Sequence, residues 1–208
     1  MPQKNISVEQ IETGRMANFS YIVGNPAAGS CFLVDPSWDI GKIEAEALAA
    51  GLKIEACILT HGHYDHSMHL EELARRLKVP VYLHAADLFM MDMDNSLVTT
   101  FSGGAVLTLA GIEVTAVPTP GHSPGSVCLI AGGNIFTGDT LFIGACGRVD
   151  LPGSDPKSMT DSLRRVAKLD PELIMWPGHD YGERRSVRLG DEVRLNPYIK
   201  FALRGITP

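Results

Sequence analysis

The sequence has no long apolar run and no cluster of basic residues. No stretch approaches the uninterrupted run of about 18 apolar residues that a membrane-spanning helix needs. Acidic residues outnumber basic ones, 24 to 18, and the net charge of −6 disfavours nucleic acid or an anionic membrane as partner. The first residues lack the basic segment and apolar run of a signal peptide, so we expect none.

Cysteine is also scarce. The four cysteines, Cys31, Cys57, Cys128 and Cys146, are far apart and form no C-x-x-C pair. Cys57 and Cys128 lie inside apolar segments, where free buried thiols are common. We therefore expect no disulfide framework and a cytoplasmic protein. We expect Cys146 to pack beneath a turn rather than to react.

The remaining composition is that of a globular chain. With 208 residues, 45% of them hydrophobic and 20% charged, the sequence fits one large domain or two small ones. Apolar runs between turn residues predict strands, and apolar residues at helical spacing predict helices. The predicted strands cover 5–11, 18–23, 30–34, 54–60, 79–84, 105–109, 112–117, 127–131, 134–137 and 172–177, and the predicted helices 39–50, 69–77 and 156–169. Glycine-rich turns favour antiparallel hairpins over a regular βαβ alternation. The methionine-rich, acidic segment 90–96 is expected to be a helix end or a mobile loop near the site, or a plain surface loop, which is favoured.

Histidine is concentrated at one place. The segment THGHYDH, residues 60–66, holds three of the seven histidines and follows a buried strand. Its possible donors are His61, His63, Asp65 and His66, and imidazole and carboxylate both bind first-row metals. Alternate positions on an extended segment point the same way, so His61 and His63 can share one ion. The competing interpretation is a polar loop in which the histidines form hydrogen bonds and Asp65 caps a helix. The H-x-H-x-D-H unit as a whole nevertheless favours a metal site.

Three later segments each end an apolar run with glycine and then one donor. TPGHSPGS contains His122, FTGDTLF contains Asp139 and WPGHDYG contains His179. The repeated arrangement of strand, glycine and donor indicates that these residues share a site with the cluster. His69 and His84 do not follow this arrangement, and we expect both to be structural.

Together these residues resemble the metallo-β-lactamase superfamily, whose pattern is H-x-H-x-D-H followed by a histidine, an aspartate and a histidine. The resemblance covers nearly the whole chain, which implies a single domain over residues 1–208. It implies an α/β (α+β) fold, a four-layer αββα sandwich, with the metal site on one edge between two sheets. It also implies two divalent metal ions, of which zinc is expected first and iron or manganese are alternatives. His61, His63 and His122 would hold one ion, Asp65, His66 and His179 the other, and Asp139 and a water or hydroxide would bridge them.

The segment GDTLFIGACGRVDLPGSD resembles the glyoxalase II group, the hydroxyacylglutathione hydrolases, and the related persulfide dioxygenases. The resemblance implies a metal-dependent hydrolase that cleaves a thioester such as S-lactoylglutathione, with Asp65 steering the attacking water. A mononuclear iron persulfide dioxygenase using His61, His122 and Asp139 is the main alternative. A lactonase and a metal-binding protein without activity are further alternatives.

Substrate contacts are expected from Arg148, Lys157 and Tyr181, which lie near the C-G-R and H-D-Y segments. Longer glyoxalase II enzymes carry a C-terminal helical domain with basic residues that bind glutathione, whereas this sequence ends soon after His179. A smaller or different thioester is therefore an expected substrate. We expect a small-molecule substrate and no nucleic acid or membrane partner. The protein is either a monomer or a homo-oligomer.

Overall fold

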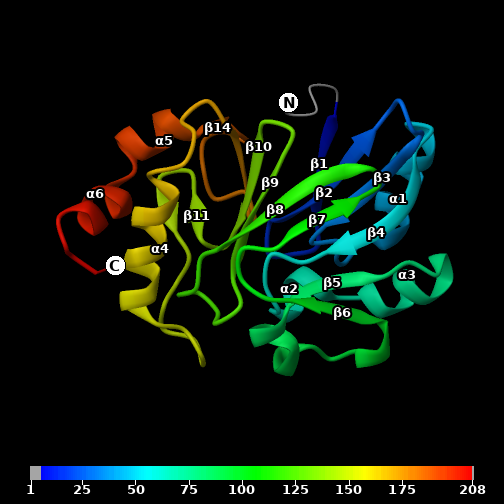
Figure 1. Ribbon diagram of the computed structural model, residues 1–208, viewed down its shortest axis with the longest axis horizontal. Helices are drawn as coiled ribbons and strands as arrows, with labels where there is room; N and C mark the ends of the chain where they lie inside the picture. The colour runs from blue at the N-terminus through cyan, green and yellow to red at the C-terminus, as the bar shows by residue number, and fades with distance from the viewer. Residues whose placement is uncertain (1–5, 208) are drawn as a thin grey trace.

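Two six-stranded sheets face each other in the computed structural model, which describes residues 6–207 (Figure 1). The first sheet contains, in order, β1 (Ser7–Thr13), β2 (Asn18–Asn25), β3 (Ser30–Val34), β4 (Lys53–Ile58), β5 (Val81–His84) and β6 (Val98–Phe101). The second contains β14 (Val187–Arg188), β13 (Ile174–Pro177), β10 (Asn134–Gly138), β9 (Val127–Ala131), β8 (Ile112–Pro118) and β7 (Val106–Leu109). A small hairpin joins β11 (Leu141–Phe142) to β12 (Ala145–Cys146).

Helices cover the outer face of each sheet. On the first sheet lie α1 (Ile40–Ala49) and α3 (Leu70–Leu77), and the short α2 (Tyr64–Ser67) precedes α3. On the second lie α4 (Pro156–Val166), α5 (Leu189–Leu195) and α6 (Pro197–Leu203), at the left of Figure 1. Two 3₁₀ turns, η1 (Ala85–Met90) and η2 (Asn95–Leu97), connect β5 to β6.

Three separate apolar cores show that the chain forms four layers. One core fills the space between the sheets, a second joins the first sheet to α1 and α3, and a third joins the second sheet to α4, α5 and α6. The alternation of side chains along a strand produces this arrangement. In β2, Tyr21 and Val23 enter the core between the sheets, and Ile22 enters the core under the helices. The predicted αββα sandwich is confirmed.

The strand pairing differs from the predicted hairpins in both sheets, and in the second sheet β10 and β13 are parallel neighbours. In the first sheet β1, β2 and β3 are antiparallel, but β3, β4, β5 and β6 are all parallel neighbours. Helix α1 makes the crossover from β3 to β4, α3 lies in that from β4 to β5, and the 3₁₀ turns η1 and η2 make that from β5 to β6. Strand β6 was not predicted, because VTTF lacks a long apolar run, and residue 5 of the first predicted strand lies outside the described residues.

No helix within residues 6–207 is long and apolar enough to cross a membrane. The four cysteines, all within this range, are unpaired. The expected loop at 90–96 is replaced in part by η1, which ends at Met90, and by η2.

Candidate metal centre

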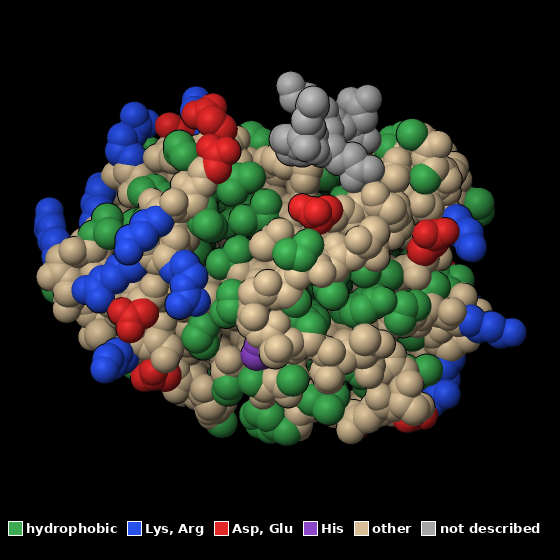
Figure 2. Space-filling model, in the orientation of Figure 1, with side chains coloured by type: hydrophobic (Ala, Val, Ile, Leu, Met, Phe, Trp, Pro, Cys, Tyr) green, Lys and Arg blue, Asp and Glu red, His purple; other side chains and the backbone are tan. Residues whose placement is uncertain are grey.

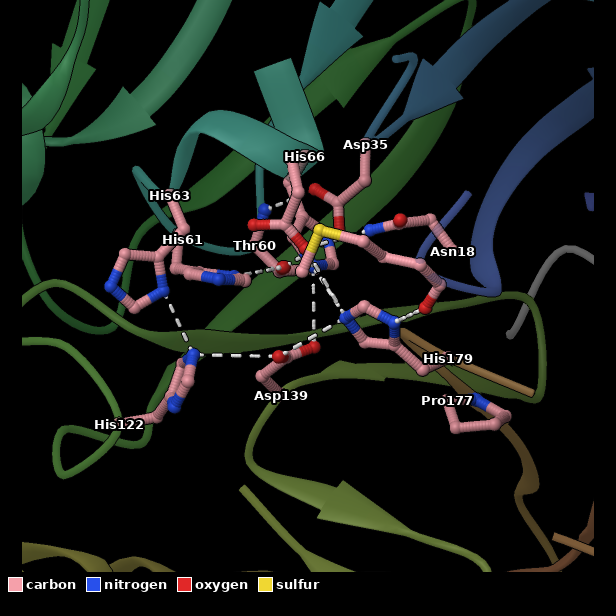
Figure 3. Close-up of polar contacts among 12 residues, drawn as sticks. Asn18, Asp35, Thr60, His61, His63, His66, His122, Asp139, Pro177 and His179 are labelled. Carbon is pink, nitrogen blue, oxygen red and sulfur yellow. Dashed lines mark hydrogen bonds and ion pairs between the residues drawn. The ribbon is translucent and has the colours of Figure 1, made fainter. Parts of the chain in front are cut away.

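The seven predicted ligands meet at one edge of the sandwich, where strands of both sheets end (Figure 3). His61 and His63 follow β4, and the first turn of α2 presents Asp65 and His66. The second sheet supplies three residues, each directly after a strand or in a turn between strands: His122 between β8 and β9, Asp139 after β10 and His179 after β13. Four of the five ligand histidines are buried, and histidine is barely visible on the face drawn in Figure 2.

Glycine precedes three of these ligands because the backbone segments approach each other closely. A Cβ on Gly178 would lie 2.4 Å from Oδ1 of Asp139, and one on Gly138 would lie 2.3 Å from Oγ1 of Thr60. Gly121 has a φ of +146°, and its Cβ would lie 2.5 Å from backbone atoms of Met159. The glycine pattern in the sequence therefore reflects close approach as well as turning.

The first group of ligands is His61, His63 and His122, whose donor atoms lie within 4.8 Å of one another. Nδ1 of His63 lies 2.9 Å from Nε2 of His122. The ring centroid of His61 lies 4.8 Å from that of His63 and 5.0 Å from that of His122. Three imidazole nitrogens thus converge on one point.

The second group is Asp65, His66 and His179, within the same 4.8 Å limit. Nε2 of His66 lies 3.2 Å from Nε2 of His179. Oδ2 of Asp65 lies 3.6 Å from Nε2 of His66 and 3.5 Å from Nε2 of His179.

Asp139 lies between the two groups. Its Oδ2 is 3.4 Å from Nε2 of His122 in the first group and 3.3 Å from Nε2 of His179 in the second. Its Oδ1 is 3.3 Å from Nε2 of His66. A carboxylate in this position can bind an ion in each group.

The donor atoms themselves fit bound cations. Nε2 of His61 is buried without a hydrogen-bond partner, and such an atom is costly unless something binds it. In the close His63–His122 and His66–His179 pairs, two ring nitrogens face each other, as they do when both point at a shared ion. Neutral imidazole and carboxylate donors suit zinc, iron or manganese.

Each ligand ring except that of His63 is held through its other nitrogen. Nδ1 of His122 donates to the carbonyl of Arg148 at 2.9 Å, and Nδ1 of His179 donates to the carbonyl of Met16 at 2.8 Å. Nδ1 of His61 lies 3.1 Å from Oγ1 of Thr60. A carbonyl can only accept, so it fixes the proton on Nδ1 and leaves Nε2 free to bind a metal.

Sequence reasoning missed Asp35, which is fully enclosed behind His66. Its Oδ2 lies 3.0 Å from Nδ1 of His66 and accepts the hydroxyl of Thr60 at 2.7 Å, and its Oδ1 accepts the backbone N–H of Thr60 at 2.7 Å. The available signal was an aspartate directly after a buried strand, which is also the setting of Asp139. The sequence Asp-Pro-Ser indicated a turn instead, and no glycine marks the position.

Asn18 was missed as well. Its Nδ2 donates to Oδ2 of Asp65 at 2.9 Å and so fixes the orientation of that carboxylate. The backbone of the same segment holds the His179 loop: the N–H of Phe19 donates to Gly178, and the N–H of Asp180 donates to Ala17. Strand β2 thus supports the ligands of the second group.

Asp87, in η1, links the ligand loops of the two sheets. Its carboxylate is fully buried and accepts the N–H of Gly62 at 2.9 Å, the hydroxyl of Ser123 at 2.6 Å and the N–H of Gly125 at 2.5 Å. Gly62 lies between His61 and His63, and Ser123 follows His122. One carboxylate therefore connects all the ligands of the first group through their backbones.

The charges of the cluster shift its pKa values strongly when no cation is bound. Burial, together with the charge of His66, holds the pKa of His61 well below its usual range. Burial also opposes the charge of His179, but hydrogen bonds to Asp139 and Asp65 outweigh it and raise the pKa to about 9. Burial opposes the charge of His66 as well, but the charge of Asp139 and hydrogen bonds to Asp139 and Asp35 raise the pKa of His66 well above its usual range. Metal binding at His66 and His179 must therefore displace protons, whereas His61 is already neutral near pH 7.

A cavity of about 640 Å³ opens beside the cluster and is lined by His63, Asp65, His122, Asp139 and His179 among others. Two of the three predicted substrate residues, Arg148 and Tyr181, also line it. Lys157 lies in the first turn of α4 and is exposed, and it is not among the described residues that line the cavity.

The remaining sequence expectations concern single residues. Nδ1 of His69 lies 2.9 Å from the carbonyl of Trp38, and Nδ1 of His84 accepts the N–H of Ala86, so both have structural partners. Cys146 borders the cavity and packs on the core under α4. Burial raises the pKa of its thiol to about 11, which disfavours the reactive thiolate.

Comparison with known proteins supports one family. A sequence profile of the metallo-beta-lactamase superfamily matches residues 13–179. A probable polyketide biosynthesis zinc-dependent hydrolase of Bacillus velezensis, BaeB, is 30% identical over 196 residues, which are 93% of this chain and 87% of that protein. A hydroxyacylglutathione hydrolase of Anaeromyxobacter dehalogenans is 38% identical over 165 residues, or 79% of this chain, but the match spans only 62% of that protein.

Solved structures agree with this assignment. The crystal structure of ETHE1 from Myxococcus xanthus superposes with a TM-score of 0.83 at 25% identity, covering 93% of this chain and 84% of that one. TTHA1623 in a di-iron-bound form superposes with a TM-score of 0.77 at 33% identity, covering 92% of this chain and 100% of that one. The sequence profile, the shared fold and the seven converging ligands lead to one conclusion: the chain belongs to the metallo-beta-lactamase superfamily.

Proposed function

We propose that the protein is a hydrolase with a two-metal site that cleaves thioesters. The observation that carries the proposal is the position of Asp139, whose two oxygens lie 3.3–3.4 Å from ligand nitrogens of both groups. The hydrolase names of the relatives from Bacillus velezensis and Anaeromyxobacter dehalogenans support it. The zinc-dependent name of one relative and the di-iron form of TTHA1623 are consistent with zinc or iron as the metal.

The bound cations would supply two things: they polarise a carbonyl, and they lower the pKa of bound water from about 15.7 to roughly 7. The chain supplies the rest. Asp65 lines the cavity, and its Oδ2 is oriented by Asn18 at 2.9 Å. Burial alone would raise the pKa of Asp65, but the hydrogen bond to His179 and the charge of His66 lower it to about 2. Asp65 is therefore ionised near pH 7 and can orient the attacking water through a hydrogen bond.

The leaving group needs little help from the protein. A thiol has a pKa near 8.5, so a thiolate leaves without a strong general acid. The described residues that line the cavity include no lysine and no protonated carboxylic acid placed to serve as one. Tyr181 also lines the cavity, but burial and the charges of Asp139 and Asp65 raise its pKa, which makes it a poor proton donor.

Metal analysis with a thioester assay tests the proposal. We expect two ions per chain and hydrolysis of thioesters such as S-lactoylglutathione that stops after chelation and returns with metal. Asp65→Asn is expected to lower kcat by about 10²–10⁴-fold, the usual contribution of a positioned acid or base, whereas His69→Gln, outside the cluster, leaves it unchanged. One iron per chain with oxygen uptake on glutathione persulfide would establish the dioxygenase alternative, and turnover of lactones alone would establish the lactonase.

A further inference from the structure

The cavity beside the cluster is mainly apolar once the ligands are set aside. Its lining includes Met90, Leu151 and Pro152 near the first group of ligands. Met90 packs on the loop of that group, since a Cβ on Gly62 would lie 3.1 Å from Cβ of Met90. The segment of Leu151 follows Arg148, whose carbonyl holds His122. This part of the wall is therefore fixed to the ligand loops.

Aromatic rings form the wall near the second group. Tyr181 is 57% exposed, yet its ring stacks on that of His179 with centroids 4.7 Å apart and an interplanar angle of 10°. Phe142 is buried and meets Tyr181 edge-on at 5.2 Å. At the mouth, Tyr64 is 56% exposed and its hydroxyl contacts Sδ of Met16 at 3.2 Å. Rings held by such contacts offer apolar area at little cost in side-chain entropy.

The charges on the wall do not suit an anionic substrate. Among the described lining residues the only lysine or arginine is Arg148. Two of its three guanidinium nitrogens, Nε and Nη2, donate to the carboxylate of Asp150 at 2.7 Å and 2.9 Å, so this arginine is paired within its own loop. The other charged side chains of the wall outside the histidines are the carboxylates Asp65 and Asp139. Glutathione carries two carboxylates, and this wall offers them no unpaired cationic side chain.

On the basis of the proposed thioester hydrolysis, we propose that the cavity binds an uncharged, apolar acyl group. Met90, Phe142 and Leu151 then form the acyl-binding site. The substrate class is then an acyl thioester whose aliphatic chain lies in the cavity, with the thiol portion toward solvent. Glutathione is not the part that the protein recognises. Specificity follows from the buried length of the chain, because each methylene removed from water contributes up to about a fourfold gain in binding.

A matched panel of thioesters tests the proposal. Acetyl, butyryl, hexanoyl and succinyl groups are compared on N-acetylcysteamine, and hexanoyl and lactoyl groups are compared on both N-acetylcysteamine and glutathione. We expect kcat/KM to rise by about tenfold or more from acetyl to hexanoyl, since partial burial gives roughly a twofold gain per methylene. We expect succinyl to be no better than acetyl, and the change of thiol to alter kcat/KM by less than about threefold.

Binding of the product acids provides a second measurement that does not need turnover. The metal-loaded protein is titrated with acetate, hexanoate and succinate by calorimetry, and hexanoate is expected to bind at least about tenfold tighter than acetate. Hydrolysis that does not depend on chain length would contradict the acyl-binding site but not the hydrolase activity. A kcat/KM for S-lactoylglutathione that is tenfold above that for hexanoyl-N-acetylcysteamine would do the same. If no thioester is hydrolysed but hexanoate binds tighter than acetate, the proposed reaction is wrong and the acyl-binding site is supported. Equal binding of the acids without turnover contradicts both.

Two variants test whether the cavity wall forms the acyl-binding site. Leu151→Glu places a charge in the wall and is expected to lower the hexanoyl-to-acetyl ratio of kcat/KM at least about fivefold. Leu203→Glu is the control, because Leu203 is 56% exposed on α6 and outside the cavity lining. Loss of the ratio in both variants, with unchanged melting temperatures, would show that the cavity wall does not set the preference.

Discussion

Replacing Asp87 with asparagine is expected to destabilise the fold and to weaken metal binding at His61, His63 and His122. The carboxylate accepts three hydrogen bonds: its Oδ1 accepts the N–H of Gly125, and its Oδ2 accepts the N–H of Gly62 and the hydroxyl of Ser123. An amide has only one oxygen. Whichever way it turns, its NH₂ group faces one of the two backbone N–H groups, and that buried donor loses its acceptor.

The size of the effect follows from this geometry. A buried donor left without a partner costs about 1–3 kcal/mol, so we expect a loss near 2 kcal/mol in the free energy of unfolding. For a chain of this length that corresponds to a fall of about 4–8 °C in melting temperature. Substitutions behind metal ligands typically weaken metal binding by about 10–100-fold. Asp87 acts through the backbone of the loops, so we expect about tenfold.

Two measurements check this prediction. Thermal unfolding of the metal-free protein gives the loss of stability, and competition against a chromophoric chelator gives metal affinity. The control is Ile43→Ala, which opens a cavity between α1 and the first sheet, far from the ligand loops, and costs about 2–5 kcal/mol. The reasoning is refuted if Asp87→Asn loses stability while keeping its metal affinity, or if Ile43→Ala weakens metal binding to the same degree.

Three further predictions concern the second ligand group, the bridging aspartate and the metal. Asp35→Asn puts an NH₂ group against either Nδ1 of His66 or the N–H of Thr60. We expect metal affinity, measured by competition against the chromophoric chelator, to fall about 10–100-fold. An unchanged affinity would contradict this role of Asp35. Gly147→Ala would bring a Cβ within 1.8 Å of the carbonyl oxygen of Asp139, so we expect at least about a tenfold loss of kcat, whereas Gly41→Ala, with open space around it, stays active. Free metal at about 100 times its Kd should add about 2.7 kcal/mol of stability, and an unchanged melting temperature after chelation would contradict a metal site formed only in the folded state.

Much of the fold and the ligand set could be predicted from sequence because the signals are local. The apolar runs at 30–34 and 127–131, bounded by turn residues, predicted two strands whose observed bounds are the same. The ligands lie within a few residues of strand ends, where glycine marks the turn. The parallel pairing of β3 to β6 and the strand β6 could not be predicted in this way, because pairing depends on contacts between segments far apart in the chain.

The sequence by itself determined the kind of donors, their order and the glycines that allow their loops to approach. Only the tertiary structure decided what holds them. Asp35 reaches His66 across 31 residues, and the carbonyl of Met16 reaches His179 across 163. Such hydrogen bonds leave no periodic trace in the sequence, since each needs only a single acceptor, a carboxylate in one case and a backbone carbonyl in the other. The cavity is decided in the same way: folding brings Arg148 and Tyr181 to its wall and leaves Lys157 on the surface of α4.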